Sequence, residues 1–425
     1  MQVQDLYAIF LQHPSIQTDT RKLKTGDLFF ALKGPNFNGN LFALQALDAG
    51  AAFAVIDEQP GAEDSRLIIV TDVLQCLQDL AAYHRSKFQI PFIAITGSNG
   101  KTTTKELVSE VLSTTFKTYT TTGNLNNHIG VPLTLLSVKE DAQMAVIEMG
   151  ANHQKEIESY CRYTMPTHGI ITNCGKAHLE GFGSEAGVRK AKGELFDYLR
   201  EHDGTAFIMQ DYDYLVEMSK GIPHLKTYGT TDADIIGRAS QDTAFLQVAI
   251  SRGAEQLQLN TNLVGDYNLP NVLAAVAIGR HFGVEDAMIK KALEQYMPSN
   301  SRSQLLMRGD NTIILDAYNA NPSSMKAAIE NFARLAGNEK VLLLGAMMEL
   351  GSDSLREHQD IIHLINQHPW KHVVLVGGDF KNIFHHYQYF ENVTEAQEWI
   401  DKQKLSNAQV LVKGSRSIQM EKVLG

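Results

Sequence analysis

Residues 92–104 read Phe-Ile-Ala-Ile-Thr-Gly-Ser-Asn-Gly-Lys-Thr-Thr-Thr, a short apolar run with a glycine turn after it. Gly97 and Gly100 allow backbone conformations that other residues resist, so N–H groups can turn toward an anion at the positive end of a following helix. Lys101 would reach the outer phosphates of a nucleotide, and the Thr102 hydroxyl would hold Mg²⁺. The stretch therefore predicts a strand, a phosphate-binding loop and a helix that together bind a nucleoside triphosphate.

The loop departs from the usual phosphate-loop pattern at one position. That pattern is G-x-x-x-x-G-K-[ST], and Ile95 stands where its first glycine would be. A shorter G-x-x-G-K-T can also form an ordinary strand-to-helix corner with a solvated lysine. We favour phosphate binding because the apolar run, the turn and the helix fall where that mechanism requires them.

The composition describes a soluble globular protein of two or three domains. The chain has 425 residues, 44% of them hydrophobic and 20% charged, and a net charge of −10 that disfavours nucleic-acid partners. Its three cysteines have neither disulfide-scaffold nor metal-ligand spacing. The N-terminus lacks the pattern of a signal peptide, and no apolar run approaches membrane-spanning length. We therefore expect a cytoplasmic protein, acting as a monomer, that binds no nucleic acid and does not insert into a membrane.

The order of apolar runs predicts an α/β fold with three domains. Residues 1–88 combine short β-type runs with one helical pattern, and Pro91 follows their boundary. Residues 89–297 alternate apolar strands with helices, which is typical of a mostly parallel sheet covered on both faces, and we expect residues 226–265 to form an antiparallel edge. Residues 298–425 repeat an apolar strand followed by a glycine turn. This is a dinucleotide-fold pattern, but the full G-x-G-x-x-G fingerprint is missing, so we infer no NAD binding.

Two polar groups follow predicted strands of the middle segment. Glu148 ends the run Val-Ile-Glu, and a carboxylate at the C-terminal end of a parallel strand can face the ligand crevice and hold Mg²⁺. Capping a neighbouring helix is the alternative. His178 follows another apolar run. Three roles are open for it: ligating a second metal ion, ordering a nucleophile, or a purely structural one. The phosphate loop favours the metal role for Glu148.

Four other polar segments have both a functional and a structural interpretation. Residues 124–130 are dense in amide side chains, which recognise neutral polar ligands but also form turns. Residues 316–322, Asp-Ala-Tyr-Asn-Ala-Asn-Pro, suit a ribose or phosphate pocket, although Asn-Pro is also a routine turn. Residues 413–416, Lys-Gly-Ser-Arg, would clamp a carboxylate through the arginine fork or form an exposed basic turn. Residues 189–194 read as a solvated charged helix face, and spacing alone does not single out Lys192.

Together these segments resemble the Mur ligase family, which builds the peptide stem of bacterial cell-wall precursors. The resemblance spans nearly the whole chain. It implies an N-terminal domain for the UDP sugar, a central P-loop ATPase-type domain with a mostly parallel sheet, and a C-terminal dinucleotide-binding-like doubly wound domain. It also accounts for Ile95, since this family uses the shorter loop. The segments that carry it are residues 20–34, 96–103, 126–134, 148–150, 177–183, 318–322 and 413–416.

The resemblance implies roles for individual residues. Thr102 and Glu148 would hold one Mg²⁺ and His178 a second, while Lys192 aligns with a lysine that is typically carbamylated, which turns a cation into an anionic oxygen ligand. The catalytic residues would thus be Lys101, Glu148, His178 and Lys192. The ATP-binding positions would be Gly97, Ser98, Asn99, Gly100, Lys101, Thr102, Thr103, Asn268, Asn271, Arg302 and Asp316. Of these, Arg302 and Asp316 would meet the nucleotide when the domains close. The substrate-binding positions are Arg21, Asn126, Asn127, Thr134, Asn319, Asn321, Lys413, Ser415 and Arg416.

The resemblance is greatest to those members that join D-alanyl-D-alanine to a UDP-N-acetylmuramoyl-tripeptide. The implied reaction consumes ATP and passes through an acyl phosphate, which must be kept from water, so we expect the third domain to close onto the second about linkers near residues 89 and 298. The alternative within the class is a Mur-type or folylpolyglutamate-type ligase that adds a single amino acid. A nucleotide-binding regulator is the alternative outside it. The chain departs from the family pattern at Tyr267, Leu315 and Ala346.

Overall fold

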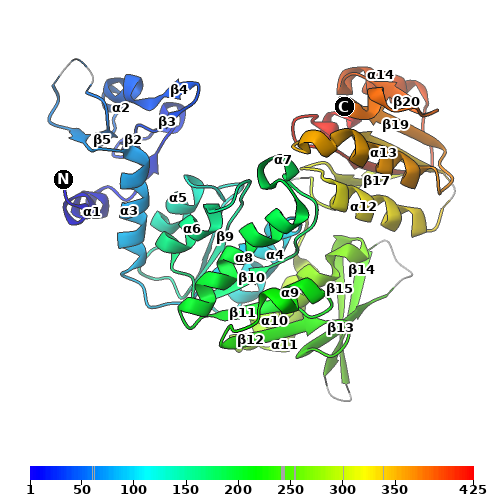
Figure 1. Ribbon diagram of the computed structural model, residues 1–425, viewed down its shortest axis with the longest axis horizontal. Helices are drawn as coiled ribbons and strands as arrows, with labels where there is room; N and C mark the ends of the chain where they lie inside the picture. Colours follow the sequence, from blue (N-terminus) through cyan, green and yellow to red (C-terminus); the bar gives the residue numbers. More distant parts are fainter. Residues whose placement is uncertain (60, 62, 241–244, 253–254, 300, 338) are drawn as a thin grey trace.

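The computed structural model describes residues 1–425 except 60, 62, 241–244, 253–254, 300 and 338. Three α/β bodies follow one another along the chain, and each is built around its own sheet (Figure 1). The N-terminal body, in blue, and the C-terminal body, in orange and red, lie above opposite ends of the central body in this view. The predicted α/β fold of three domains is confirmed. Within the part of the chain described, no helix combines the length and apolar character needed to cross a bilayer.

The N-terminal body is a small parallel sheet with helices around it. Its elements are α1 (Val3–Gln12), β1 (Ile16–Gln17), β2 (Leu28–Phe30), β3 (Lys33–Gly34), β4 (Phe37–Asn38), α2 (Ala43–Asp48), β5 (Phe53–Ile56), β6 (Leu67–Ile69) and α3 (Val73–Arg85). The order of the main sheet is β1-β2-β5-β6. Helix α3 begins where the Asp72 side chain accepts a hydrogen bond from the backbone N–H of Gln75, and it carries the chain toward the central body.

The central body has a nine-stranded sheet whose strand β7 leads into the phosphate loop. Its elements are β7 (Phe92–Thr96), α4 (Lys101–Ser113), β8 (Thr118–Thr120), α5 (Gly130–Leu136), β9 (Met144–Glu148), α6 (Glu156–Thr164), β10 (His168–Ile171), α7 (Leu179–Phe182), α8 (Glu185–Glu201), β11 (Thr205–Met209), α9 (Asp213–Met218), β12 (His224–Gly229), β13 (Ile235–Ala239), β14 (Phe245–Arg252), β15 (Glu255–Val264), α10 (Leu269–His281) and α11 (Asp286–Gln295). The order is β15-β14-β13-β12-β11-β10-β7-β9-β8. β7 pairs in parallel with both β10 and β9. All of its residues are buried, as expected for a strand covered on both faces.

The antiparallel edge predicted for residues 226–265 is only partly correct. β12 pairs in parallel with β11 because α9 returns the chain to the end of the sheet where β11 began. β13 also pairs in parallel with β12. The antiparallel pairs are β13 with β14 and β14 with β15. β12 is exposed over residues 224–226 and buried at its end. The polar residues that suggested an edge therefore mark the exposed start of a parallel strand.

The C-terminal body is a six-stranded sheet with helices on both faces. Its elements are β16 (Gln304–Arg308), β17 (Asn311–Asp316), α12 (Pro322–Arg334), β18 (Lys340–Gly345), α13 (Ser354–Ile365), β19 (His372–Val376), β20 (Gln388–Phe390), α14 (Val393–Lys402) and β21 (Gln409–Lys413). The order is β16-β17-β21-β18-β19-β20, with β16 antiparallel to β17. Along β18, Leu342 and Leu344 share a core with Ile329 of α12, whereas Leu343 shares one with Ile400 of α14. This alternation is the doubly wound arrangement.

The joint between the N-terminal and central bodies, here called the α3 joint, is buried. Helix α3 packs against α5 and α6. Arg85, in its last turn, donates to the carbonyl oxygens of Phe88 (2.9 Å), Thr164 (2.8 Å) and Met165 (2.8 Å). Its guanidinium carbon lies 3.8 Å from the centroid of the Phe92 ring. One buried side chain thus ties together the chain segment after α3, the start of β7 and the end of α6.

The joint between the central and C-terminal bodies, here called the linker joint, is held by ion pairs and hydrogen bonds between side chains that are mostly part-exposed. In Figure 1 the C-terminal body meets the central one beside α7 and α12. These polar contacts tie α7, the segment before it and the segment before α10 to the C-terminal body. The ion pairs across this joint are Lys176 with Glu357 (2.8 Å) and Arg334 with Asp266 (2.8 Å). His178 also lies 2.5 Å from Glu349, a contact that is an ion pair when the imidazole is protonated.

Candidate active site

The phosphate loop connects β7 to α4 and depends on two glycines. Gly97 has a φ of 142° and Gly100 a φ of 79°, conformations that residues with a Cβ atom disfavour. A Cβ atom at Gly97 would lie 2.0 Å from the Thr172 hydroxyl oxygen, and one at Gly100 would lie 2.5 Å from Oδ1 of Asn271. Both positions therefore need glycine for space as well as for conformation.

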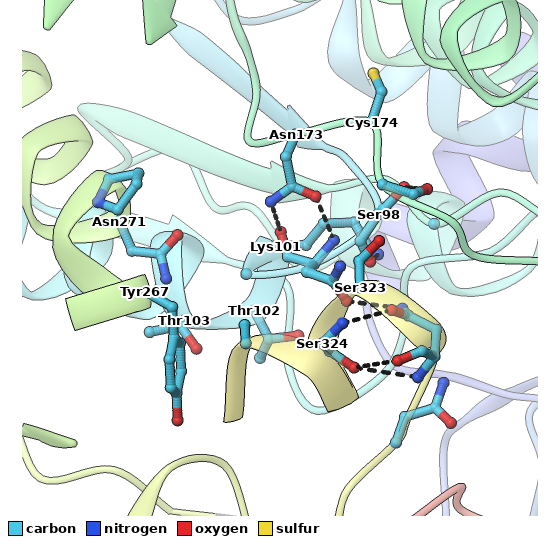
Figure 2. Close-up of a pocket in the computed structure, with 18 of the residues that line it drawn as sticks. Ser98, Lys101, Thr102, Thr103, Asn173, Cys174, Tyr267, Asn271, Ser323 and Ser324 are labelled. Atoms are coloured by element: carbon cyan, nitrogen blue, oxygen red, sulfur yellow. Dashed lines mark hydrogen bonds between the residues drawn. The ribbon is translucent and has the colours of Figure 1, made fainter. Parts of the chain in front are cut away.

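Asn173, which follows β10, fixes the shape of the loop (Figure 2). Its carbonyl oxygen accepts from the Ser98 N–H (2.8 Å), while its side chain accepts from the Asn99 N–H (3.0 Å) and donates to the Asn99 carbonyl (3.0 Å). The N–H groups in the first turn of α4 have no acceptor within the helix. Because residues 98–103 line a cavity, those N–H groups remain for an anionic ligand.

Lys101 folds back over the loop that precedes it. Its Nζ donates to the carbonyl oxygens of Gly97 (2.8 Å) and Ser98 (3.1 Å). Burial lowers the pKa of the Lys101 ammonium, a shift that Glu148 opposes and Arg302 reinforces. An arriving phosphate would offer this ammonium a charged acceptor, which makes a stronger hydrogen bond than a carbonyl does.

Glu148 ends β9 with one carboxylate oxygen bonded and the other free. The residue is 1% exposed, and its Oε1 accepts from Nδ2 of Asn126 (2.7 Å) and from the Thr102 hydroxyl (3.1 Å). Its Oε2 is buried and finds no hydrogen-bond partner in the described part of the chain. A buried carboxylate oxygen without a donor is costly unless a ligand reaches it. Since Mg²⁺ prefers oxygen donors, Glu148 and Thr102 fit such an ion.

The protein alone offers few ligands for that ion. Over the residues that the structure describes, no three His, Cys, Asp or Glu side chains gather in a metal-binding arrangement. Mg²⁺ keeps several waters and is commonly held by one or two carboxylates together with substrate phosphates. The Glu148–Thr102 pair is therefore suited to an ion that arrives with a nucleotide.

Lys192, in α8, lies behind the cavity wall. It is 1% exposed, and its Nζ donates to the carbonyl oxygen of Ala151 (3.1 Å), a residue that lines the cavity. Burial lowers the pKa of Lys192 to about 7, and the positive charge of Lys101 contributes to the shift. A lysine in this setting is partly neutral near neutral pH, so its nitrogen is nucleophilic.

His178 lies where the central and C-terminal bodies meet. It precedes α7 with a φ of 51° and lines the cavity. Its Nδ1 is 2.5 Å from Oε2 of Glu349, and this close contact lowers the pKa of the Glu349 carboxyl. In this arrangement His178 is bonded to the C-terminal body, and its assignment to a second metal ion stays a prediction.

The N-terminus of α12 faces the phosphate loop across the cavity. Asn321 caps the helix by accepting from the Ser324 N–H (2.9 Å), and its Nδ2 donates to Oδ1 of Asn99 (2.7 Å). The Ser323 hydroxyl accepts from the Lys176 N–H (2.9 Å). Figure 2 shows Ser323 and Ser324 beside the loop. Helix N-termini carry a partial positive charge, so α4 and α12 together favour a polyphosphate in the space between them.

Asp316 and Arg302 lie on the C-terminal side of the cavity. Oδ2 of Asp316 accepts from Nζ of Lys413 (2.6 Å), and Oδ1 accepts from the Ser303 N–H (3.0 Å). The guanidinium carbon of Arg302 lies 3.5 Å from the centroid of the Tyr318 ring. Both oxygens of Asp316 are therefore bonded to protein, whereas Arg302 presents its N–H groups in the cavity.

Asn268 and Asn271 form a chain of amide hydrogen bonds. The Thr104 hydroxyl donates to Oδ1 of Asn271 (3.0 Å), whose Nδ2 donates to Oδ1 of Asn268 (2.9 Å). Nδ2 of Asn268 donates to the Val264 carbonyl (2.9 Å). These amides hold α10 against α4 in this structure, and their contact with ATP stays a prediction.

A cavity of about 1020 Å³ brings most of the predicted residues together. It extends from the phosphate loop past the end of β9 to the N-terminus of α12. It therefore holds residues from segments far apart in the sequence. The predicted residues that line it are Ser98, Asn99, Gly100, Lys101, Thr102, Thr103, Asn126, Asn127, Glu148, His178, Asn268, Asn271, Arg302, Asp316, Asn319, Asn321 and Lys413.

Several predicted substrate residues do not line this cavity. Arg21 is exposed on the N-terminal body, where it pairs with Asp19 (2.8 Å). Thr134 is buried in α5 and donates to a carbonyl oxygen one turn earlier (2.9 Å). Ser415 is buried and bonded to backbone groups, and the exposed Arg416 contacts a glutamate (3.2 Å). Their substrate contacts stay predictions.

Among the cavity residues that were given no role from the sequence are Asn173, Ser323 and Tyr318. Asn173 follows an apolar strand as Glu148 does, so its position was a usable signal. Ser323 follows Asn321-Pro322, a pattern that marks a helix start and hence an anion-favouring end. For Tyr318 the sequence offers no such signal, because its partner Arg302 lies in a different segment.

Comparisons with known proteins agree with this geometry. Residues 14–85, 95–279 and 301–416 match the descriptions "Mur ligase family, catalytic domain", "Mur ligase middle domain" and "Mur ligase, glutamate ligase domain". The UDP-N-acetylmuramoyl-tripeptide–D-alanyl-D-alanine ligases of Escherichia coli (strain K12) and Bacillus subtilis (strain 168) are 36% and 34% identical to this chain, each over 96% of it and 92% of the relative. The crystal structure of MurF from Acinetobacter baumannii superposes with a TM-score of 0.90 at 30% identity, covering 100% of this chain and 97% of that one. The chain therefore belongs to the Mur ligase family.

Proposed function

We propose that this chain joins D-alanyl-D-alanine to UDP-N-acetylmuramoyl-tripeptide in an ATP-dependent, ADP-forming reaction, which yields the pentapeptide precursor of peptidoglycan. The relatives that carry this activity in their names match the chain over nearly its whole length. The structural observation that supports it most directly is the free Oε2 of Glu148, buried beside Thr102 at a phosphate loop. A carboxylate at this position suits phosphoryl transfer rather than nucleotide binding alone.

The reaction needs activation because a carboxylate is a poor electrophile: its leaving group would be oxide. Attack by the terminal carboxylate of the tripeptide on the γ-phosphorus of ATP forms an acyl phosphate and releases ADP. The free amine of D-alanyl-D-alanine then attacks the acyl carbon. The resulting tetrahedral intermediate loses its proton and expels phosphate, which leaves the new amide bond.

The protein's own groups position and neutralise the phosphate chain. The Lys101 ammonium would move from its two loop carbonyls to the phosphoryl oxygens, and the first turns of α4 and α12 would add N–H donors. The Thr102 hydroxyl and Oε2 of Glu148 would hold Mg²⁺, which offsets phosphate charge when it is bound. Asn126 keeps Oε1 of Glu148 occupied (2.7 Å), so that Oε2 is the oxygen left for the ion.

We also propose that Lys192 is carbamylated. Its burial and lowered pKa favour the neutral amine, which is the form that adds CO₂ at its nitrogen to give a carbamate and a proton. Carbon-13 bicarbonate should produce a carbamate resonance that is absent from Lys192→Ala, and short carboxylic acids should restore turnover to that variant. An active enzyme with no such resonance would contradict this assignment.

Substrate contacts are proposed for Asn127, Asn319 and Asn321, whose side chains line the cavity. The same proposal extends to Arg21 and Arg416, which would require the peptide or its UDP group to reach beyond the cavity. A cytoplasmic enzyme acting as a monomer is the simplest form for a reaction that uses ATP. Light scattering on the purified protein measures its oligomeric state.

The deciding experiment measures phosphate release and product mass with ATP, Mg²⁺ and the UDP-linked tripeptide. D-alanyl-D-alanine should give a product larger by the dipeptide, while D-alanine, L-lysine and L-glutamate should give none. Product with a single amino acid would instead assign the chain to another activity of the family. Nucleotide binding with no amine-dependent phosphate release would exclude ligation.

A further inference from the structure

The segment that links the central and C-terminal bodies has an unusual backbone around Arg302. Ser301 has a φ of 56° and Ser303 a φ of 48°. Left-handed conformations are uncommon for residues other than glycine and persist where the surroundings hold them in place. Because both neighbours of Arg302 adopt them, the direction in which this arginine leaves the chain is set by the structure on either side of it.

Two hydrogen bonds fasten these serines to the strand end that follows. The Tyr318 N–H donates to the Ser301 carbonyl (3.1 Å), and the Ser303 N–H donates to Oδ1 of Asp316 (3.0 Å). The Ser303 hydroxyl also lies 3.1 Å from the hydroxyl of Tyr267, in the central body. Ser301 is thus held to Tyr318 itself, and Ser303 to Asp316, two residues before that tyrosine.

The Arg302 side chain is held by the Tyr318 ring. Its guanidinium carbon lies 3.5 Å from the ring centroid, within the range of a cation–π contact. In the described part of the chain its guanidinium makes no hydrogen bond or ion pair. Arg416 is farther from the same ring, at 5.6 Å, and is paired with Glu421. The N–H fork of Arg302 is therefore available in the cavity that it shares with Lys101.

We propose that Tyr318 is a positioning residue that aims Arg302 at the phosphate chain of the bound nucleotide. Stacking on the ring occupies one face of the guanidinium and leaves its N–H edge for anionic oxygens, the geometry in which arginine binds phosphate. The left-handed serines bring the arginine to the ring. This inference rests on the proposed function, because it takes ATP to be the ligand of the cavity.

A double-mutant cycle on nucleotide affinity tests the proposal. The probe is the non-hydrolysable β,γ-imido analogue of ATP with Mg²⁺, measured by calorimetry on the full chain. Tyr318→Leu should weaken binding by a factor on the order of 3 to 10, and Tyr318→Phe should keep most of the affinity because its ring can still stack. In an Arg302→Ala background, Tyr318→Leu should cause no further loss. Steady-state kinetics should show the same pattern in KM for ATP, with KM for the dipeptide unchanged.

Two further variants separate this role from others. Tyr83→Leu removes a ring that stacks on Lys87 at 3.9 Å, away from the cavity, and should leave nucleotide affinity as it is. Arg416→Ala should not abolish the effect of Tyr318→Leu. Equal losses from Tyr318→Leu with and without Arg302, or a loss that disappears only with Arg416→Ala, would overturn the proposal.

The binding readout also distinguishes this inference from the proposed function. If the protein shows the predicted coupling in nucleotide affinity but does not join the dipeptide to the UDP-linked tripeptide, the role of Tyr318 stands and the ligase assignment fails. If the protein forms product but the effects of the Tyr318 and Arg302 variants are additive, the ligase assignment stands and the role of Tyr318 fails. If Tyr318→Leu does not fold, Tyr318→Met takes its place in the cycle, because it also lacks the ring.

Discussion

The α3 joint and the linker joint connect the same central body to its two neighbours in different ways. At the α3 joint, Arg85 is 7% exposed and all its hydrogen bonds go to backbone carbonyls. At the linker joint, the ion pair of Arg334 and Asp266 has side chains that are 61% and 42% exposed. Water can replace an exposed ion pair such as this one at little cost, whereas removing the buried Arg85 would leave backbone carbonyls without their donor.

This difference separates a fixed interface from one that can open. The cavity lies at the linker joint, where Asn99 of the phosphate loop contacts Asn321 of the C-terminal body. Substrates must enter there, and an acyl phosphate must later be kept from water. We therefore expect the connection to the N-terminal body to stay closed and the connection beside the cavity to open more easily.

Lys101→Ala should produce the largest effect, because it removes the cation that meets the transferring phosphoryl group. Turnover should fall by a factor on the order of 10³ or more, as expected for the loss of a preorganised charge in phosphoryl transfer. The urea midpoint should stay near that of the wild type, since Nζ bonds only to two carbonyls of its own loop. Coupled phosphate-release assays and urea unfolding measure the two quantities. A folded variant with near-normal ligation would remove Lys101 from the mechanism.

Arg85→Met should lower the free energy of unfolding at the α3 joint by about 3 kcal/mol, because buried carbonyls of Thr164 and Met165 lose their donor. The loss should appear in far-UV circular dichroism. Tryptophan emission should report it less, since the two tryptophans, Trp370 and Trp399, both lie in the C-terminal body.

Arg66→Met is the matched control for that variant, because Arg66 is a part-exposed arginine of the N-terminal body paired with Asp64 at 2.7 Å. It should cost only a few tenths of a kcal/mol. If both variants cost the same, the α3 joint is no more tightly held than the surface.

Glu349→Gln should weaken the linker joint by under about 1 kcal/mol, a small value because the Glu349 side chain is half exposed. The close contact with His178 lowers the pKa of Glu349 below its ordinary 4.5. The carboxylate therefore stabilises the joint above about pH 4.5, and that contribution is lost as the pH falls through the lowered pKa.

Tryptophan-detected urea midpoints measure this effect. The wild type should exceed Glu349→Gln near pH 7 and should equal it at about pH 3. An offset that stays constant across this range would mean that the carboxylate charge does not contribute to the joint.

Arg334→Ala should have the smallest effect, a few tenths of a kcal/mol on stability, because its ion pair with Asp266 is exposed at both ends. Added salt should reduce even that difference. Small-angle scattering should show no more opening than in the wild type. A clear expansion would mean that this one surface contact holds the linker joint closed.

The sequence predicted where the glycine loop and Glu148 lie in the fold, because both positions depend on local order along the chain. A glycine turn between an apolar strand and a helix specifies its own geometry, and the end of a parallel strand faces the crevice whatever the rest of the fold. The parallel pairing of β12 was not predicted, since an exposed strand start resembles an edge.

The partners of the amide side chains could not be predicted either. Asn126 binds Glu148, and Asn271 binds Thr104, through contacts between segments distant in sequence. An amide offers donors and acceptors in every setting, so its chemistry does not reveal which partner the fold supplies. For the same reason the pairing of His178 with Glu349 follows only from the placement of the C-terminal body.

The hydrogen bonds between Asn173 and the phosphate loop have a consequence for the folding of this chain during translation. Asn99 and its partner Asn173 are 74 residues apart, and chains emerge from the ribosome N-terminus first. A nascent chain that stops short of Asn173 should have a folded N-terminal sheet, complete by Ile69, but no nucleotide affinity. The ability to bind ATP is thus acquired only after the first domain has formed.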